Sequence, residues 1–90
     1  MKLLNDIGSG FRDEGVLWVS DMVKNNPSLA TEELERNTVY YLENLVRGYT
    51  LINRPKIRAM PRLKSQILAI LDFLMLKGSV TGYLLREDIL

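Results

Sequence analysis

The amino-acid sequence predicts an all-α fold, a compact bundle of about four helices. Apolar residues recur at intervals of three and four positions in several segments, a spacing that places them on one face of an α-helix. Between these segments lie prolines, glycines and asparagines, which are typical of turns and helix ends. With 90 residues, 47% of them hydrophobic, the chain has the size and composition of a single globular domain covering residues 1–90.

The first helix is predicted at about 11–24. It follows residues 1–10, whose glycines and serine lead us to interpret them as a flexible N-terminal segment. It ends before Pro27, because the residue preceding a proline is disfavoured in the α region. Trp18 lies on the apolar stripe of this helix, and we expect its side chain in the core.

The second helix is predicted at about 32–53. Thr31 can cap its free backbone N–H groups, and the glutamates that follow suit the positive end of the helix dipole. Apolar residues cover one broad face of this segment, and charged residues cover the other. The five residues between Pro55 and Pro61 are expected to form a turn that leads into the next helix.

The last two helices are predicted at about 62–77 and 80–88. Pro61 suits the first position of a helix, and Gly78 suits the left-handed conformation that often ends one. The helix at 62–77 is apolar around most of its circumference, so we expect it to be central or covered on two sides. Ser79 is the predicted N-cap of the helix at 80–88.

The absence of cysteine and histidine excludes whole classes of chemistry. No disulfide, thiol nucleophile, imidazole base or Cys/His zinc site can form. We therefore expect a protein that is not an enzyme and that has no metal site and no cofactor. No apolar run is long enough to span a membrane, and the N-terminus does not resemble a signal peptide, so we expect a cytoplasmic protein.

Charge is unevenly distributed along the chain, although the net charge is only +1. Residues 1–43 hold eight acids and four bases, whereas residues 44–71 hold six bases and no acid. We name residues 54–64 the basic corner, because two prolines should gather its cations at one junction between helices. Its five cations are Arg54, Lys56, Arg58, Arg62 and Lys64. Phosphate oxygens or acidic side chains are their natural partners.

The basic corner has a simpler interpretation as well. Its cations can form a solvated surface that is partly neutralised by acids of the first half, such as Glu32, Glu33 or Glu35. Tyr40 and Arg47 are further candidate contact residues, because they fall on the polar face of the helix at 32–53.

One stretch near the end of the chain shows a local resemblance to a known family. Residues 67–74 read ILAILDFL, and residues 77–85 read KGSVTGYLL. Together they resemble the first helix, the turn and the second helix of PadR-like winged-helix regulators, over about a quarter of the chain. The resemblance implies a DNA-binding regulator. The sequence departs from that pattern by ending at Leu90, before a recognition helix or a wing, so we carry over no residue roles.

The function predicted from these observations is a non-catalytic protein–protein interaction or adaptor module. It would use the basic corner and apolar helix faces, with an acidic protein surface as the partner. One alternative is a small nucleic-acid-binding or regulatory domain, in which the same cations neutralise phosphates. Another alternative is a helical fragment of a larger protein or an obligate homodimer, because both Ile89 and Leu90 are apolar.

Overall fold

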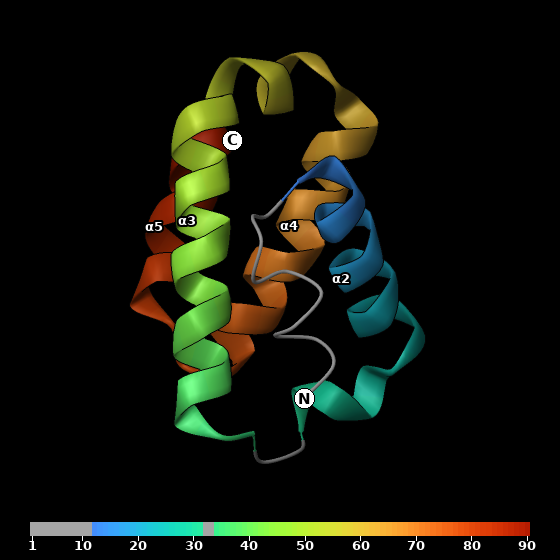
Figure 1. The fold of residues 1–90 in the computed structure, drawn as a ribbon, viewed down its shortest axis with the longest axis vertical. Coiled ribbons are helices and arrows are strands. Elements are labelled where there is room, and N and C mark those ends of the chain that lie inside the picture. The colour runs from blue at the N-terminus through green and yellow to red at the C-terminus, as the bar shows by residue number, and fades with distance from the viewer. Residues whose placement is uncertain (1–11, 32–33) are drawn as a thin grey trace.

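The computed structural model describes residues 12–31 and 34–90, so the predicted N-terminal segment 1–10 lies outside the described residues. The described part forms four α-helices and one short 3-10 helix. They are α2 (Asp13–Asn25), η1 (Pro27–Ala30), α3 (Arg36–Ala59), α4 (Pro61–Leu76) and α5 (Val80–Ile89). Helices α2 and α4 run in one direction, and α3 and α5 run in the other (Figure 1). The predicted all-α bundle is confirmed.

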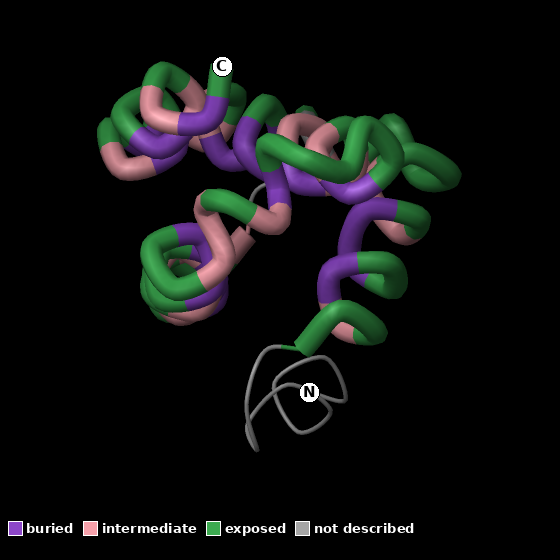
Figure 2. Tube along the Cα trace, turned by 90° about the horizontal axis from the view of Figure 1, so that it is seen from above, coloured by how far each residue is buried: buried purple, intermediate pink, exposed green. Residues whose placement is uncertain are grey.

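Helix α4 is the centre of the bundle. It packs against α2, α3 and α5, and α5 also packs against α3, whereas the backbones of α2 and α3 barely approach each other. Seen from above, the buried residues of the helices face a shared interior (Figure 2). Three sides of α4 are therefore covered, which is why its sequence is apolar around most of the helix. The prediction of a central or doubly covered helix is confirmed.

The predicted start of the second helix is wrong. Helix α3 begins at Arg36, and Thr31 instead ends η1, where its hydroxyl donates a hydrogen bond to the Ser28 carbonyl at 3.0 Å. A threonine hydroxyl can stabilise either end of a helix, and its sequence position does not distinguish the two roles. The first turn of α3 contains no acid, and Glu35 occupies its N-cap position without a side-chain hydrogen bond.

Helix α3 continues past its predicted end, but with a kink. Asn53 leaves helical geometry, with φ −109° and ψ 19°, two residues before Pro55. Proline cannot donate a backbone hydrogen bond, and its ring clashes with the carbonyl four residues earlier. The Asn53 side-chain amide donates to the Tyr49 carbonyl at 3.0 Å, which stabilises the kinked backbone. The chain then resumes a helical course to Ala59, so the predicted turn between the prolines is helical.

The junction between α4 and α5 follows the prediction closely. Gly78 has φ 84°, a backbone conformation that residues with a Cβ atom rarely adopt. The Ser79 hydroxyl accepts a hydrogen bond from the Gly82 N–H at 2.9 Å and caps α5. A Cβ atom at Gly82 would lie 3.1 Å from the Leu71 carbonyl oxygen, so glycine lets α5 lie close against α4.

The expected burial of Trp18 is wrong, because its side chain is 41% exposed. The buried residues of α2 are Val16, Val19 and Ser20, which form a narrow stripe. Helix α2 packs mainly against one helix, α4, so only that stripe is covered. An apolar residue beside the stripe remains in contact with solvent.

Candidate functional site

The basic corner lies at the end of the bundle where α3 passes into α4 (Figure 1). Three of its cations come from the end of α3, beyond the Asn53 kink, and two come from the start of α4. The C-terminal end of α5 lies beside them, because Arg54 and Arg58 both contact Asp88. The structure therefore gathers part of the predicted site around the end of another helix.

Arg54 and Arg58 hold the end of α5. The Arg54 guanidinium forms an ion pair with the Asp88 carboxylate at 2.5 Å, and Arg58 donates to the Asp88 backbone carbonyl at 2.5 Å. The last carbonyls of a helix lack partners within the helix, and its C-terminal end favours positive charge. The side chains of Arg54 and Asp88 are both more than a third exposed, so this ion pair contributes less than about 1 kcal/mol. Two of the predicted site residues thus act within the fold.

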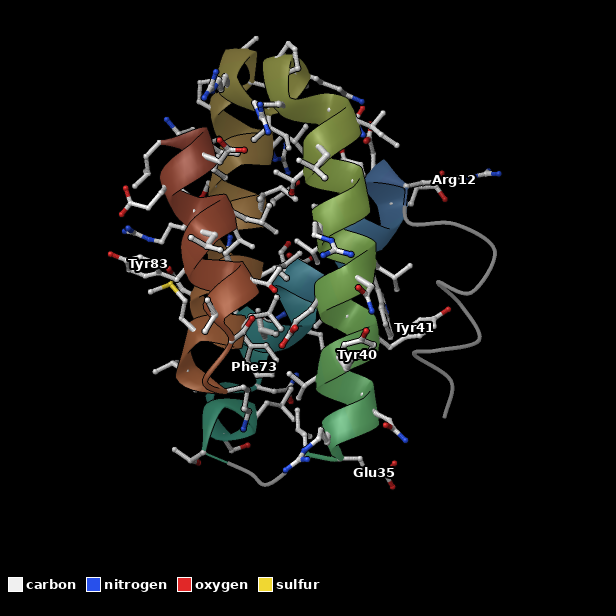
Figure 3. The ribbon with its side chains drawn as sticks, turned by 90° about the vertical axis from the view of Figure 1, so that its left-hand side faces the viewer. Arg12, Glu35, Tyr40, Tyr41, Phe73 and Tyr83 are labelled. Carbon is white, nitrogen blue, oxygen red and sulfur yellow. The ribbon has the colours of Figure 1, made fainter. Side chains whose placement is uncertain are left out.

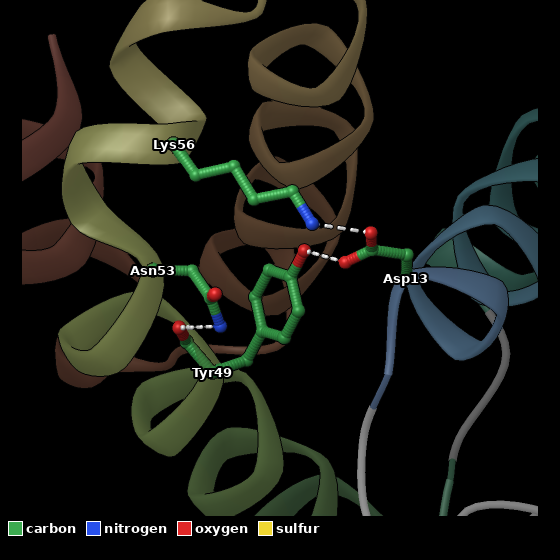
Figure 4. A network of polar contacts seen from close by, with 4 residues as sticks. All are labelled: Asp13, Tyr49, Asn53 and Lys56. Atoms are coloured by element: carbon green, nitrogen blue, oxygen red, sulfur yellow. Dashed lines mark hydrogen bonds and ion pairs between the residues drawn. The ribbon is translucent and has the colours of Figure 1, made fainter.

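Lys56 connects α3 to α2 through Asp13 (Figure 4). Its ammonium group lies 2.5 Å from one Asp13 oxygen, and the Tyr49 hydroxyl donates to the other. The Lys56 hydrogen bond, together with that from Tyr49, lowers the pKa of the Asp13 carboxyl below 3.8. Burial of the Tyr49 side chain, reinforced by the neighbouring carboxylate, raises the pKa of its hydroxyl well above 10. We name Asp13, Tyr49 and Lys56 the polar link.

Of the predicted glutamates, Glu35 does not neutralise the basic corner, whereas Asp13, another acid of the first half, does. Asp13 and Asp88 meet its cations, whereas Glu35 lies at the other end of α3, about 28 Å from Arg54 along the helix axis. Glu32 and Glu33 lie outside the described residues. Sequence alone could not identify the pairs, because Asp13 and Asp88 come from other helices.

Arg62 and Lys64 form no ion pair with any residue that the structure describes. Arg62 is exposed, and Lys64 is half-buried beside a shallow surface depression that also contains Asp72. Together with Arg58, whose partner is an uncharged carbonyl, they leave three positive charges without a carboxylate partner among residues 12–31 and 34–90. These three are the part of the corner that remains able to attract an anionic partner.

Tyr40 and Arg47 do not join the basic corner. Tyr40 is 64% exposed and projects from the outer face of α3, as predicted (Figure 3). It lies 14 residues before Arg54, about 21 Å along the helix axis. Arg47 is exposed and donates to the Asn44 side chain at 3.3 Å. The predicted site residues therefore occupy two separate places on the surface.

The sequence-based reasoning did not identify an apolar surface on α5, which we name the α5 outer face. Val80 is 71% exposed, Tyr83 53% and Leu84 61%. These positions are three and four residues apart, so they share one side of the helix, and Tyr83 projects into solvent (Figure 3). The opposite side of α5 buries Leu85 and Ile89 in the core. The signal for this surface in the sequence was a predicted helix with apolar residues on both of its faces.

Other kinds of site receive no support from the described residues. Among them, no group of three or more acids, cysteines or histidines is placed to hold a metal ion. No helix in the described part of the chain is long and apolar enough to cross a membrane.

No protein-family model matches the chain, and no curated protein shows significant similarity to it. The local resemblance of residues 67–85 to PadR-like regulators therefore assigns no role to any residue in α4 or α5.

Proposed function

We propose that this protein is a non-catalytic interaction module that binds a partner protein on the α5 outer face. The observation that carries the proposal is the exposure of Val80, Tyr83 and Leu84 on a helix that is also apolar toward the core. A surface helix normally turns charged and polar residues toward solvent, so apolar residues on the outer side of α5 as well as toward the core are unusual. Exposed apolar patches on monomers often mark interaction sites.

The α5 outer face is small, so the free energy from covering it must be compared with the cost of association. Complete burial of one large apolar side chain contributes about 1.5 to 3 kcal/mol. The three side chains are between half and three quarters exposed, so covering them contributes about 3 to 5 kcal/mol. Association costs at least about 4 kcal/mol in lost translational and rotational freedom. The α5 outer face alone does not hold a partner, and adjoining contacts are needed.

The basic corner supplies those adjoining contacts. It borders the C-terminal end of α5, because Arg58 reaches the Asp88 carbonyl. Arg62 follows at the start of α4 and is exposed. An apolar centre with a charged rim is the usual arrangement of a protein interface. The matching partner has an apolar groove flanked by acidic residues.

The test of the α5 outer face compares substitutions on two helices. Tyr83→Glu and Leu84→Glu should each reduce capture of the partner at least tenfold, because both place a charge at the apolar centre. Ile52→Glu is the matched control, because Ile52 is 80% exposed on α3 and lies outside the face. Capture by pull-down is measured together with the thermal melt. The proposal fails if Ile52→Glu and Tyr83→Glu have the same effect.

The same assay tests whether the cations Arg62 and Lys64 contribute to capture of the partner. Arg62→Glu with Lys64→Glu should weaken capture, and raising the salt concentration should weaken capture by the unsubstituted protein. Arg58 is left unchanged in this variant, because it also holds the end of α5. Arg47→Glu is the control on the outer side of α3. Capture that does not depend on salt would contradict a charged rim.

Nucleic-acid binding is the alternative use of the same cations, because phosphate oxygens also suit Arg58, Arg62 and Lys64. With three available cations, the logarithm of duplex affinity should fall with the logarithm of salt concentration with a slope near −3. Such a slope, without protein capture, would favour this alternative. A second copy of the chain on the α5 outer face is the homodimer alternative, and sedimentation at micromolar concentration detects it.

A further inference from the structure

A partly enclosed apolar cavity lies at the end of the bundle opposite the basic corner. Its volume is about 220 Å³. It is bounded by the end of α2, by η1, by the start of α3 and by one residue of α4. The lining residues are Met22, Leu29, Leu34, Thr38, Val39, Leu42 and Phe73. All of them belong to the part of the chain that the structure describes.

The packing of the helices explains why this space is not filled. The backbones of α2 and α3 stay apart, and α4 bridges them from one side only. Phe73 of α4, labelled in Figure 3, is buried and lines the cavity. The 3-10 helix η1 turns across the end of α2 and contributes Leu29 to the wall. The void therefore lies where the backbones of α2 and α3 stay apart.

The chemistry of the wall defines which molecules fit. The lining residues that the structure describes present only apolar surface to the cavity, Thr38 included. None of the lining residues that the structure describes carries a charge, so they offer no compensation for the hydration that an ionised group would lose inside. Four lining residues are only partly buried, namely Met22, Leu29, Leu34 and Val39. The cavity is thus open enough for a ligand to enter while the protein stays folded.

The volume limits the ligand to a small molecule. Apolar cavities of about 150 Å³ stay dry and bind benzene or xenon. Sites for drug-sized ligands start at about 300 Å³. At about 220 Å³, this cavity has room for one aromatic ring with a short substituent, or for a short branched alkyl group.

We propose that this cavity is a binding site for a small, uncharged apolar molecule that contains a single aromatic ring or a short aliphatic chain. A ligand with so few atoms and only apolar contacts binds with a Kd of roughly 0.1 to 1 mM for a benzene-sized molecule. The site is at the other end of the molecule from the basic corner and does not depend on the proposed protein interaction.

The test uses benzene as the probe and the full chain. At a benzene concentration ten times the Kd, the melting temperature should rise by about 5 to 10 °C. Methyl resonances should shift only for the side chains that line the cavity: Met22, Leu29, Leu34, Thr38, Val39 and Leu42. Benzoate should bind at least tenfold more weakly than benzene, because its carboxylate would enter an apolar space. Equal binding of benzoate, or shifts outside these residues, would overturn the proposal.

Substitutions that fill the cavity give an independent test of the proposed site. Val39→Phe and Leu29→Phe each add a ring to the wall, from α3 and from η1, and both should abolish the benzene-dependent rise in melting temperature. The control is Ile52→Phe, which adds a ring to an exposed position of α3 and should keep the rise. If one filling variant does not fold, the other and the methyl shifts still decide. A benzene-dependent rise that survives in a folded filling variant contradicts the site.

Discussion

At the end of the bundle where α3 passes into α4, polar side chains connect the helices, whereas at the opposite end α2 and α3 enclose an apolar cavity. The polar end joins α2 to α3 through the polar link and joins α3 to α5 through Asp88. The cavity end relies on apolar burial around α4. Polar contacts at exposed positions fix orientation and contribute little energy, while apolar burial contributes more.

The polar end and the apolar end of the bundle also suit different kinds of binding partner. Arg54 and Lys56 are paired with carboxylates of α5 and α2. The charges of Arg58, Arg62 and Lys64 have no carboxylate partner among the described residues and remain available to a partner. The cavity offers shape and apolar surface but no charge, so it selects small uncharged molecules. The basic corner and the cavity thus differ in chemistry and lie at opposite ends of the bundle.

The largest effect is expected at the cavity end, from Phe73→Ala. Its side chain is buried, and losing the ring should lower the free energy of unfolding by about 3 kcal/mol. This value is at the lower end for buried phenylalanines, because one side of the ring already faces the cavity. Urea denaturation measures the change. Leu76→Ala, at an exposed position of α4, should change the free energy by less than about 0.5 kcal/mol. Equal losses of unfolding free energy in the two variants would contradict the expectation that apolar burial stabilises the cavity end.

A smaller effect is expected at the polar end, from Asp13→Ala. This change removes the acceptor that the buried Tyr49 hydroxyl uses, together with an exposed ion pair to Lys56. The expected loss is about 1 to 2 kcal/mol, most of it from the charged hydrogen bond. A double-mutant cycle with Tyr49→Phe should give a coupling energy of about 1 kcal/mol. Asp21→Ala, at an exposed position of α2, is the control. A coupling energy near zero would show that the Asp13–Tyr49 hydrogen bond contributes nothing to stability.

The smallest effect is expected in the dependence of stability on pH. The pKa of Asp13 is lower in the folded protein than its usual 3.8, so its contribution is fully present above about pH 4 and is lost as the pH falls through the folded value. The pKa of Tyr49 is raised above 10, so its contribution is present below pH 10 and is lost as the pH rises beyond that value. Urea midpoints measured across these ranges should show both losses.

Two variants assign these losses to their residues. Asp13→Asn should flatten part of the acid loss, and Tyr49→Phe should flatten part of the alkaline loss. Profiles identical to that of the unsubstituted protein would exclude the polar link as their source.

Much of the fold could be predicted because its signals are local. Gly78 and Ser79 determine how α4 ends and α5 begins through their own backbone and side-chain preferences. The apolar circumference of α4 indicated its central position. The start of α3 was predicted wrongly because Thr31 suits the end of one helix as well as the start of another.

The candidate site was predictable only in part. The sequence located the basic corner, since its cations are close together along the chain. It did not reveal that Asp13 meets Lys56, a contact between residues 43 positions apart, or that Asp88 meets Arg58, 30 positions away. It also did not show that Tyr83 and Leu84 face solvent, because burial depends on which helices cover α5.

The sequence by itself thus determined the helical class, the punctuation between helices, the segregation of charge and the absence of cysteine and histidine chemistry. These properties follow from the spacing and type of neighbouring residues. The tertiary structure alone decided which cations are neutralised, which face of α5 stays open and where α2 and α3 leave a cavity. Those outcomes depend on how whole helices pack. Packing brings together residues that are far apart along the chain, and the sequence does not indicate which of them will meet.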